Sequence, residues 1–305
     1  MSLSDAERLR RELLLRAMFP IMSGDALARF AEQLLPMTVK TGEILFETGT
    51  TPERVYFLLS GKVAMRAEGE EEWSFGPRSA IGVIDALIGR PRARRCIALA
   101  DTELLALPVS EWLDLLEDDA NSARGAIRNF SRQILTRWQA SASTPSRRTS
   151  TQPPTDFGPA LSTYDKILAL RRAEFLKPAG MQAIASLAAV AEEERYESEQ
   201  SLFEPGHTQQ KLQLVVSGGV ELRTGNDFLL VHGPGELVGG PAAFSGALTQ
   251  YAARAAGRSV VLAIHEQDYY DQVEEHVRLT RGTLAYLVTE FERVLKLKPP
   301  SATDA

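Results

Sequence analysis

The chain has 305 residues, of which 44% are hydrophobic and 24% charged, and its formal net charge is −6. Such a chain can hold two soluble globular domains of about 130 to 150 residues, each with its own core. The negative charge argues against a general nucleic-acid binder, the single cysteine, Cys96, excludes an internal disulfide, and no apolar run reaches the roughly 20 residues of a membrane helix. We therefore expect a cytoplasmic protein that binds neither nucleic acid nor membrane.

The first half of the chain has a helical, then a strand-like, then again a helical pattern of apolar residues. Residues 4–17 and 23–35 have the apolar spacing of amphipathic helices. Residues 38–107 instead consist of short runs rich in Val, Ile, Phe and Leu, separated by glycine, proline or acidic clusters. Many short strands with glycine turns are typical of a barrel or jelly roll. Helical spacing then returns over residues 110–138.

The second half runs through the same order after a change in composition. Residues 140–162 are rich in serine, threonine and proline, and such a segment cannot bury enough apolar surface to fold alone, so we expect a linker. A helix is then predicted for residues 163–191, strands for 195–264 and helices for 266–297. The tail, residues 299–305, starts with two prolines and is expected to fray.

The two halves also share a sequence repeat at a fixed offset of 157 residues, as from Gly49 to Gly206. Because glycine marks backbone positions that tolerate a positive φ or a close approach, shared glycines indicate a shared backbone path. The chain is therefore predicted to contain two copies of one domain. The matching pairs include Leu45-Phe46-Glu47 and Leu202-Phe203-Glu204, Ser60-Gly61 and Ser217-Gly218, Gly76 and Gly233, Gly82 and Gly239, and Gly89 and Gly246.

Two stretches of the first copy resemble the cyclic nucleotide-binding domain, the family of the catabolite activator protein and of the regulatory subunits of cAMP-dependent protein kinase. The first comprises residues 41–49, Thr-Gly-Glu-Ile-Leu-Phe-Glu-Thr-Gly, and residues 56–63. The second is residues 82–93, Gly-Val-Ile-Asp-Ala-Leu-Ile-Gly-Arg-Pro-Arg-Ala. It is similar to the phosphate-binding cassette that the family writes as Gly-Glu-Leu-Ala-Leu followed by Pro-Arg-Ala-Ala.

The resemblance covers nearly all of both copies and implies their fold. We expect a mainly β protein with flanking helices, made of two β jelly-roll, cyclic nucleotide-binding-like domains in tandem. The first domain would span residues 1–139 and the second residues 163–298, with the linker, residues 140–162, between them and the tail after them.

The first cassette keeps one of the two ligand anchors that the resemblance implies. Arg92 stands at the arginine position, where a guanidinium gives charge-assisted hydrogen bonds to phosphate oxygens. Val83 stands where the family has a glutamate that accepts a hydrogen bond from the ribose 2′-hydroxyl. This departure fits either a ligand without that hydroxyl contact or a pocket that no longer binds one. The predicted ligand-binding residues are Gly82, Val83, Ile84, Arg92 and Ala93.

The second cassette has lost both anchors. Gly240 stands at the glutamate position, Thr249 stands at the arginine position, and Pro241 removes a backbone donor near the helix start. A hydrogen bond to a charged group is worth about 1.5–3 kcal/mol, so the loss of both anchors leaves roughly millimolar binding or worse. Gly239, Gly240 and Thr249 are therefore predicted to form a degenerate pocket.

No catalytic residue, metal ligand or cofactor is predicted. A metal-dependent cupin enzyme shares the jelly roll but needs clustered histidines. The four histidines of this chain lack metal-ligand spacing: His207, His232, His265 and His276. The chain also lacks the glycine-rich loop of P-loop proteins and the Gly-x-Ser-x-Gly elbow of hydrolases. We therefore expect a protein that is not an enzyme.

The resemblance implies a regulatory protein of signal transduction. It would bind cAMP, cGMP or another small anion weakly in the first domain, and relay occupancy through its C-terminal helices, residues 120–139 and 271–297, to a protein partner. The long helices would also suit a homodimer. The alternative is a ligand-independent interaction or scaffold protein in which both pockets have decayed. Only eight residues follow Leu297, too few for the helix-turn-helix of the family's transcription factors, so no DNA-binding domain is expected.

Overall fold

The computed structural model describes residues 5–18, 24–70, 72–141, 157–224 and 227–295. Its contacts divide the chain into two compact units, residues 1–126 and 127–305. The division falls inside helix α5 (Ala120–Ser141), so the second half of that helix belongs to the second unit. The expected tail and most of the expected linker lie outside the described residues.

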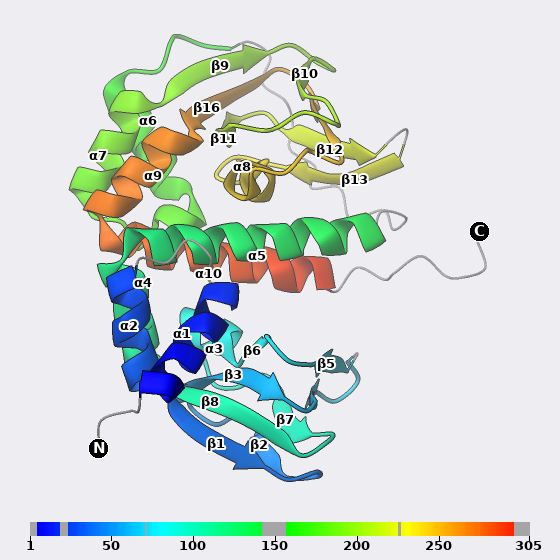
Figure 1. Ribbon diagram of the computed structural model, residues 1–305. Helices are drawn as coiled ribbons and strands as arrows, with labels where there is room; N and C mark the ends of the chain where they lie inside the picture. The colour runs from blue at the N-terminus through cyan, green and yellow to red at the C-terminus, as the bar shows by residue number, and fades with distance from the viewer. Residues whose placement is uncertain (1–4, 19–23, 71, 142–156, 225–226, 296–305) are drawn as a thin grey trace. The chain divides into compact units, whose positions relative to one another are not determined.

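The first unit is a roll of two antiparallel sheets, each with four strands (Figure 1). Its strands are β1 (Leu35–Val39), β2 (Ile44–Phe46), β3 (Arg54–Ser60), β4 (Val63–Arg66), β5 (Trp73–Phe75), β6 (Ala80–Ile81), β7 (Arg95–Ala98) and β8 (Thr102–Pro108). One sheet has the order β1-β8-β3-β6 and the other β2-β7-β4-β5. Most neighbours in a sheet are distant in sequence, so the roll closes through long-range pairing.

The second unit contains the same roll (Figure 1). Its strands are β9 (Glu192–Tyr196), β10 (Ser201–Phe203), β11 (Lys211–Ser217), β12 (Val220–Thr224), β13 (Asp227–His232), β14 (Leu237–Val238), β15 (Ala252–Ala255) and β16 (Ser259–His265). The sheet orders are β9-β16-β11-β14 and β10-β15-β12-β13, which match those of the first unit strand for strand. The prediction of two jelly rolls in tandem is therefore confirmed.

The helices before the first roll begin and end close to the predicted residues. They are α1 (Asp5–Met18) and α2 (Gly24–Gln33). After the roll, the helical spacing of residues 110–138 belongs to two helices, α4 (Val109–Asp118) and α5. Asp119 separates them because its backbone is extended, with φ −124° and ψ 100°. Its carboxylate accepts a hydrogen bond from the N–H of Ser122 at 2.7 Å, as a capping residue does at the start of a helix.

The prediction of one helix over residues 163–191 is wrong. The structure has α6 (Thr163–Arg172), a single 3₁₀ turn, η1 (Glu174–Leu176), and α7 (Met181–Val190). Pro178 follows the turn and lacks the N–H that a continuing helix would need. The second roll is followed by α9 (Glu266–Glu275) and α10 (Val277–Leu295), as expected for residues 266–297.

Aromatic side chains join the helices of the first unit to its roll. Phe30 of α2 lies 5.6 Å from Phe57 of β3 and 6.0 Å from Trp112 of α4, measured between ring centroids. Trp112 is 2% exposed, so the three rings form part of the core rather than a binding surface. Cys96 lies in the core of the roll, where burial raises the pKa of its thiol to about 12.

Two tight turns show why the glycine pairs recur at the same offset. Gly61 and Gly218 have φ 88° and 78°, a backbone conformation that side chains disfavour. A Cβ at Gly61 would lie 2.4 Å from the hydroxyl oxygen of Thr102. A Cβ at Gly218 would lie 2.5 Å from that of Ser259, the residue that matches Thr102 in the repeat. Both turns therefore need glycine for its conformation and its size.

We expect Gly61→Ala to lower the free energy of unfolding of the first unit by about 2–5 kcal/mol, since it adds both a strained φ and a close contact. Gly42→Ala is the matched control. Gly42 has φ 85°, but no atom of the described residues lies within 4 Å of a Cβ built there. The control should therefore cost only about 1–2 kcal/mol. Urea unfolding followed by tryptophan fluorescence measures both, and equal losses would contradict this account of the turn.

Candidate functional site

The predicted cassette of the first unit folds as a short helix between two glycines. α3 (Val83–Ile88) is flanked by Gly82 and Gly89, which are both left-handed, with φ 77° and 65°. Val83 is buried and Ile84 is half-buried, so both residues hold the helix against the roll. Val83 also brings no polar group to the cassette. The position where the resemblance implies a hydroxyl acceptor is therefore used for packing.

Arg92 lies inside the first unit and is only 2% exposed. Its guanidinium donates hydrogen bonds to the carbonyl oxygens of Gly82 and Arg54 and lies over the ring of Phe46, 4.3 Å from the centroid. Burial lowers the pKa of Arg92, and the nearby charge of Asp85 opposes this shift. The structure therefore brings two predicted site residues, Gly82 and Arg92, into direct contact. Two of the N–H donors of the guanidinium are engaged by neutral carbonyl groups of the chain itself.

Asp85 joins the two ends of the cassette, and the sequence analysis did not single it out. It is 3% exposed, and its Oδ2 accepts a hydrogen bond from the backbone N–H of Ala93 at 3.2 Å. Its Oδ1 accepts one from Nε of Arg90 at 2.7 Å. The backbone amide of Ala93, a predicted ligand-binding residue, thus has its hydrogen-bond partner within the chain. The sequence signal for this contact was a lone acidic residue within an otherwise apolar helix.

The second cassette keeps the backbone of the first and loses its charges. α8 (Gly240–Ser245) lies between Gly239 and Gly246, which are left-handed with φ 72° and 63°, and all of its residues are buried. Thr249 is also buried, and its hydroxyl donates to the carbonyl oxygen of Glu204 at 2.8 Å. The predicted residues of this pocket therefore form packing and turn contacts, and they bring no cation to it.

An amide and carboxylate network lies beside the second cassette. Gln209 Nε2 would be 3.4 Å from a Cβ at Gly239, and it donates to Oε1 of Gln213 at 3.1 Å. Gln213 in turn donates to the carboxylate of Glu194 at 2.9 Å, and Nζ of Lys211 donates to it at 2.8 Å. Burial opposes ionisation of Glu194, but its hydrogen bonds lower its pKa. The negative charge of Glu194 is thus paired with the positive charge of Lys211 within the network.

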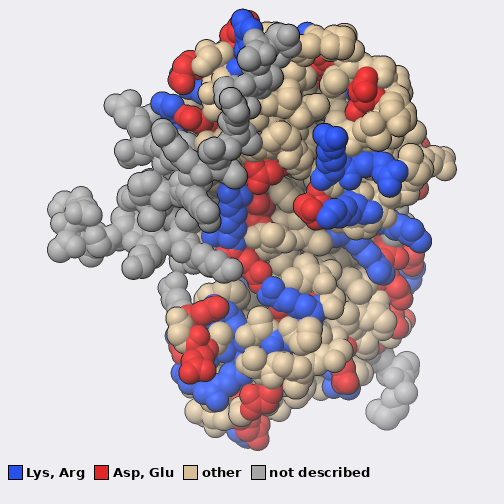
Figure 2. All heavy atoms as spheres, turned by 180° about the vertical axis from the view of Figure 1, so that it is seen from behind, with Lys and Arg blue, Asp and Glu red and all other residues tan. Residues whose placement is uncertain are grey.

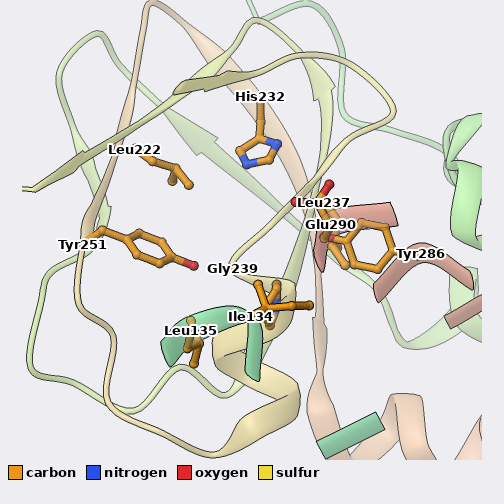
Figure 3. A pocket seen from close by; sticks show the side chains of 10 residues that line it. Ile134, Leu135, Leu222, His232, Leu237, Gly239, Tyr251, Tyr286 and Glu290 are labelled. Carbon is orange, nitrogen blue, oxygen red and sulfur yellow. The ribbon is translucent and has the colours of Figure 1, made fainter. Parts of the chain in front are cut away.

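Side chains of α5 line a cavity in the second unit. The space is small and lies between the roll, α8 and α10. Ile134 and Leu135 of α5 form one wall, and Leu135 is 6% exposed and belongs to the hydrophobic core of the roll. Figure 3 shows the ring of His232 and the hydroxyl of Tyr251 pointing into the same space. The second unit thus includes part of a helix that precedes the linker.

The ionisable groups of this cavity favour their neutral forms. Burial lowers the pKa of His232 to about 3, and its Nδ1 has no hydrogen-bond partner among the described residues. The carboxylate of Glu236 lies 3.8 Å from that nitrogen, which is too far for a hydrogen bond. Burial also raises the pKa of Glu290. Burial thus disfavours a charge on both side chains, and Arg293, 3.5 Å from Glu290, opposes the shift of Glu290.

No group of three potential metal ligands lies together among the described residues. None of the helices in this part of the chain combines the length and the apolar character that a membrane crossing demands. On the face shown in Figure 2, acidic and basic side chains are interspersed over both units.

The cyclic nucleotide-binding domain is the family whose model matches the chain, over residues 36–119 and 193–276. These two matches are separated by the same 157 residues as the repeat. No curated protein matches the chain.

Solved structures of similar architecture include regulatory parts of protein kinase A. The regulatory domain from Toxoplasma gondii with cAMP is 14% identical, with 95% of this chain and 99% of that chain covered and a TM-score of 0.37. The regulatory subunit of a cAMP-independent protein kinase A from Trypanosoma brucei is 15% identical, with 91% of each chain covered and a TM-score of 0.37. The one from Trypanosoma cruzi, bound to guanosine, is 14% identical, with 89% and 85% covered and a TM-score of 0.37.

We expect the stability of the second unit to fall as the pH drops below 6.5 because of His232. Its pKa is 6.5 in an unfolded chain and about 3 in the folded one, so between these values the unfolded state binds a proton that the folded state does not. From pH 6.5 to 4.5 this costs about 2–3 kcal/mol. His232→Phe should flatten the pH dependence of unfolding in urea, whereas His265→Gln, at an exposed position, should not. Identical pH profiles for His232→Phe and the parent would contradict this assignment.

Proposed function

The chain belongs to the cyclic nucleotide-binding domain family, and we propose that it is a non-enzymatic regulatory protein with a ligand-responsive first domain. Its two domains of this family suggest a nucleotide-sensing, regulatory role. A cyclic nucleotide, cAMP or cGMP, or another small anion would bind the first cassette weakly. The resulting change would pass through the helices to a protein partner or to a second copy of the chain.

The buried guanidinium of Arg92 carries this proposal. Its two hydrogen bonds go to neutral carbonyl oxygens, and the charge of Asp85 acts on it only from a distance. Taking a cation out of water without a directly bound counter-charge is costly. An anion that reached the guanidinium would recover part of that cost through charge-assisted hydrogen bonds. Arg92 therefore gives the first cassette a reason to prefer a negatively charged ligand.

Val83 supports the expectation that binding is weak. Its buried, apolar side chain cannot accept a hydrogen bond from a ribose hydroxyl. One missing hydrogen bond of this charge-assisted kind costs about 1.5–3 kcal/mol, which corresponds to roughly a 10- to 150-fold loss of affinity. A ligand that does not depend on a hydrogen bond from its ribose hydroxyl would lose less affinity.

Helix α5 supports a relay from the first domain to the second. The helix begins in the first unit, and from Ile127 onward its residues belong to the second unit. Leu135 then packs in the core of the second roll. Because packed cores tolerate discrete rearrangements rather than continuous deformation, a shift of α5 would change the packing of the second unit.

A ligand-independent interaction protein is the second candidate, and the second unit favours it. Thr249 stands at the arginine position, and its hydroxyl donates a hydrogen bond to a backbone carbonyl oxygen. Ile134 and Leu135 take up part of the space beside α8. A second domain of this kind would contribute a surface rather than a binding site.

Arg92→Ala should weaken the binding of cAMP and of cGMP by at least about tenfold, because a charge-assisted contact is lost. Isothermal titration of the full chain measures this loss. Arg95→Ala is the matched control, since Arg95 is an exposed arginine of β7 beside the cassette, and it should bind as the parent does. Arg92→Lys keeps the charge without the planar fork and should be intermediate. If no nucleotide gives heat with the parent, the ligand-independent candidate stands instead.

Leu135→Ala should lower the free energy of unfolding of the second unit by about 2–5 kcal/mol, as for other leucines removed from a core. Thr136→Ala, at the next and exposed position of α5, should stay within about 0.5 kcal/mol. Hydrogen exchange of the β11 and β16 amides measures the loss and also tests the relay. Saturating cAMP should change this exchange in the parent and less in Leu135→Ala. An equal response in both proteins would contradict a relay through Leu135.

A further inference from the structure

We propose that Asp85 is a resident anion of the first cassette: its carboxylate holds the donors that the phosphate of an incoming ligand would use. This inference rests on the proposed function, because it concerns how the same site admits its ligand. Two contacts carry it, the one from the backbone N–H of Ala93 at 3.2 Å and the one from Nε of Arg90 at 2.7 Å.

The position of the carboxylate distinguishes it from an ordinary surface acid. Asp85 is 3% exposed, so its charge is removed from water and must be balanced by the chain. Arg90, 35% exposed at its side chain, supplies the counter-charge in direct contact with Asp85, whereas Arg92 feels its charge only through space. One backbone donor and one guanidinium group thus bind a single negative group, as such donors would bind a phosphate.

The second copy shows that the backbone does not need this carboxylate. Ala242 stands 157 residues after Asp85, yet α8 has the same length as α3 and the same left-handed glycines at both ends. The following turn also closes in the same way in both units. The amide of Arg92 donates to the carbonyl oxygen of Thr50 at 2.8 Å, and that of Thr249 donates to His207 at 2.9 Å. A purely structural clamp would therefore be dispensable, which leaves the charge of Asp85 as its distinctive contribution.

A resident carboxylate makes the first cassette selective by charge. An anionic ligand must displace it from the amide of Ala93 or share the site with a like charge, and either event costs affinity. A neutral nucleoside meets neither cost. Asp85 would thus act as a gate that keeps the cassette satisfied at low ligand concentration. When a phosphate binds, the carboxylate of Asp85 would therefore leave the backbone N–H of Ala93.

Asp85→Asn tests the gate, because the amide keeps an acceptor of similar shape for Ala93 and removes only the charge. Titrating cAMP into the full chain should show binding at least about tenfold tighter for Asp85→Asn than for the parent. Inorganic phosphate should change in the same direction, and adenosine, which has no phosphate, should not change. Asp85→Ala copies Ala242 and serves as a second variant. Asp101→Asn, which removes an exposed charge from the turn before β8, should leave all three titrations unaltered.

The outcomes separate this inference from the proposed function. If the parent binds cAMP through Arg92 and both Asp85 variants bind no tighter, the gate is overturned and the sensor stands. If the parent gives no heat and the variants bind, the gate stands and the chain is ligand-independent as it exists. If the variants melt like the parent and none of the three proteins binds, both are overturned. An equal gain for adenosine and cAMP would also overturn the gate, because a charge effect requires a charged ligand.

Discussion

Both rolls depend on a backbone that enters the left-handed region at the same places. Gly82 and Gly89 frame α3 with positive φ, and Gly239 and Gly246 frame α8 in the same way. Few residues other than glycine adopt this conformation without strain, so each frame fixes where a short helix starts and stops. The predicted ligand-binding residues lie on these two frames or directly after them. The side chains on them have diverged while the frames have not.

Because the side chains differ, the groups of the two cassettes find their partners within the chain in two different ways. In the first unit the contacts are polar: Arg92 donates hydrogen bonds to backbone carbonyl oxygens, and Asp85 accepts one from the amide of Ala93. In the second unit, the means are mostly apolar, since α8 is fully buried and Leu135 of α5 completes the core. The polar arrangement contains donors of the kind that bind phosphate oxygens, so under the proposed function a ligand of the right charge would take over these hydrogen bonds. The apolar arrangement offers no such exchange.

The sequence predicted the roll, the repeat and the position of both cassettes, because glycine spacing reports backbone conformation directly. It failed where the outcome depends on contacts between distant residues. The break at Asp119 depends on a local cap that competes with helical spacing, and the break before α7 depends on Pro178. The burial of Arg92 could not be read from a segment with several arginines, since only the fold decides which of them lies over Phe46. The sequence shows Asp85 as an acidic residue in an apolar helix, but it does not predict the contact with the backbone N–H of Ala93, eight residues later.

Because the units divide inside α5, the boundary between the two structural units does not coincide with the boundary between the two sequence copies. The sequence starts its second copy after the linker, whereas the core of the second roll already includes Leu135, which lies before it. A fragment that began at the linker would lack a core side chain and expose the apolar wall that it covers. The last helix of the first copy is thus also a structural component of the second unit.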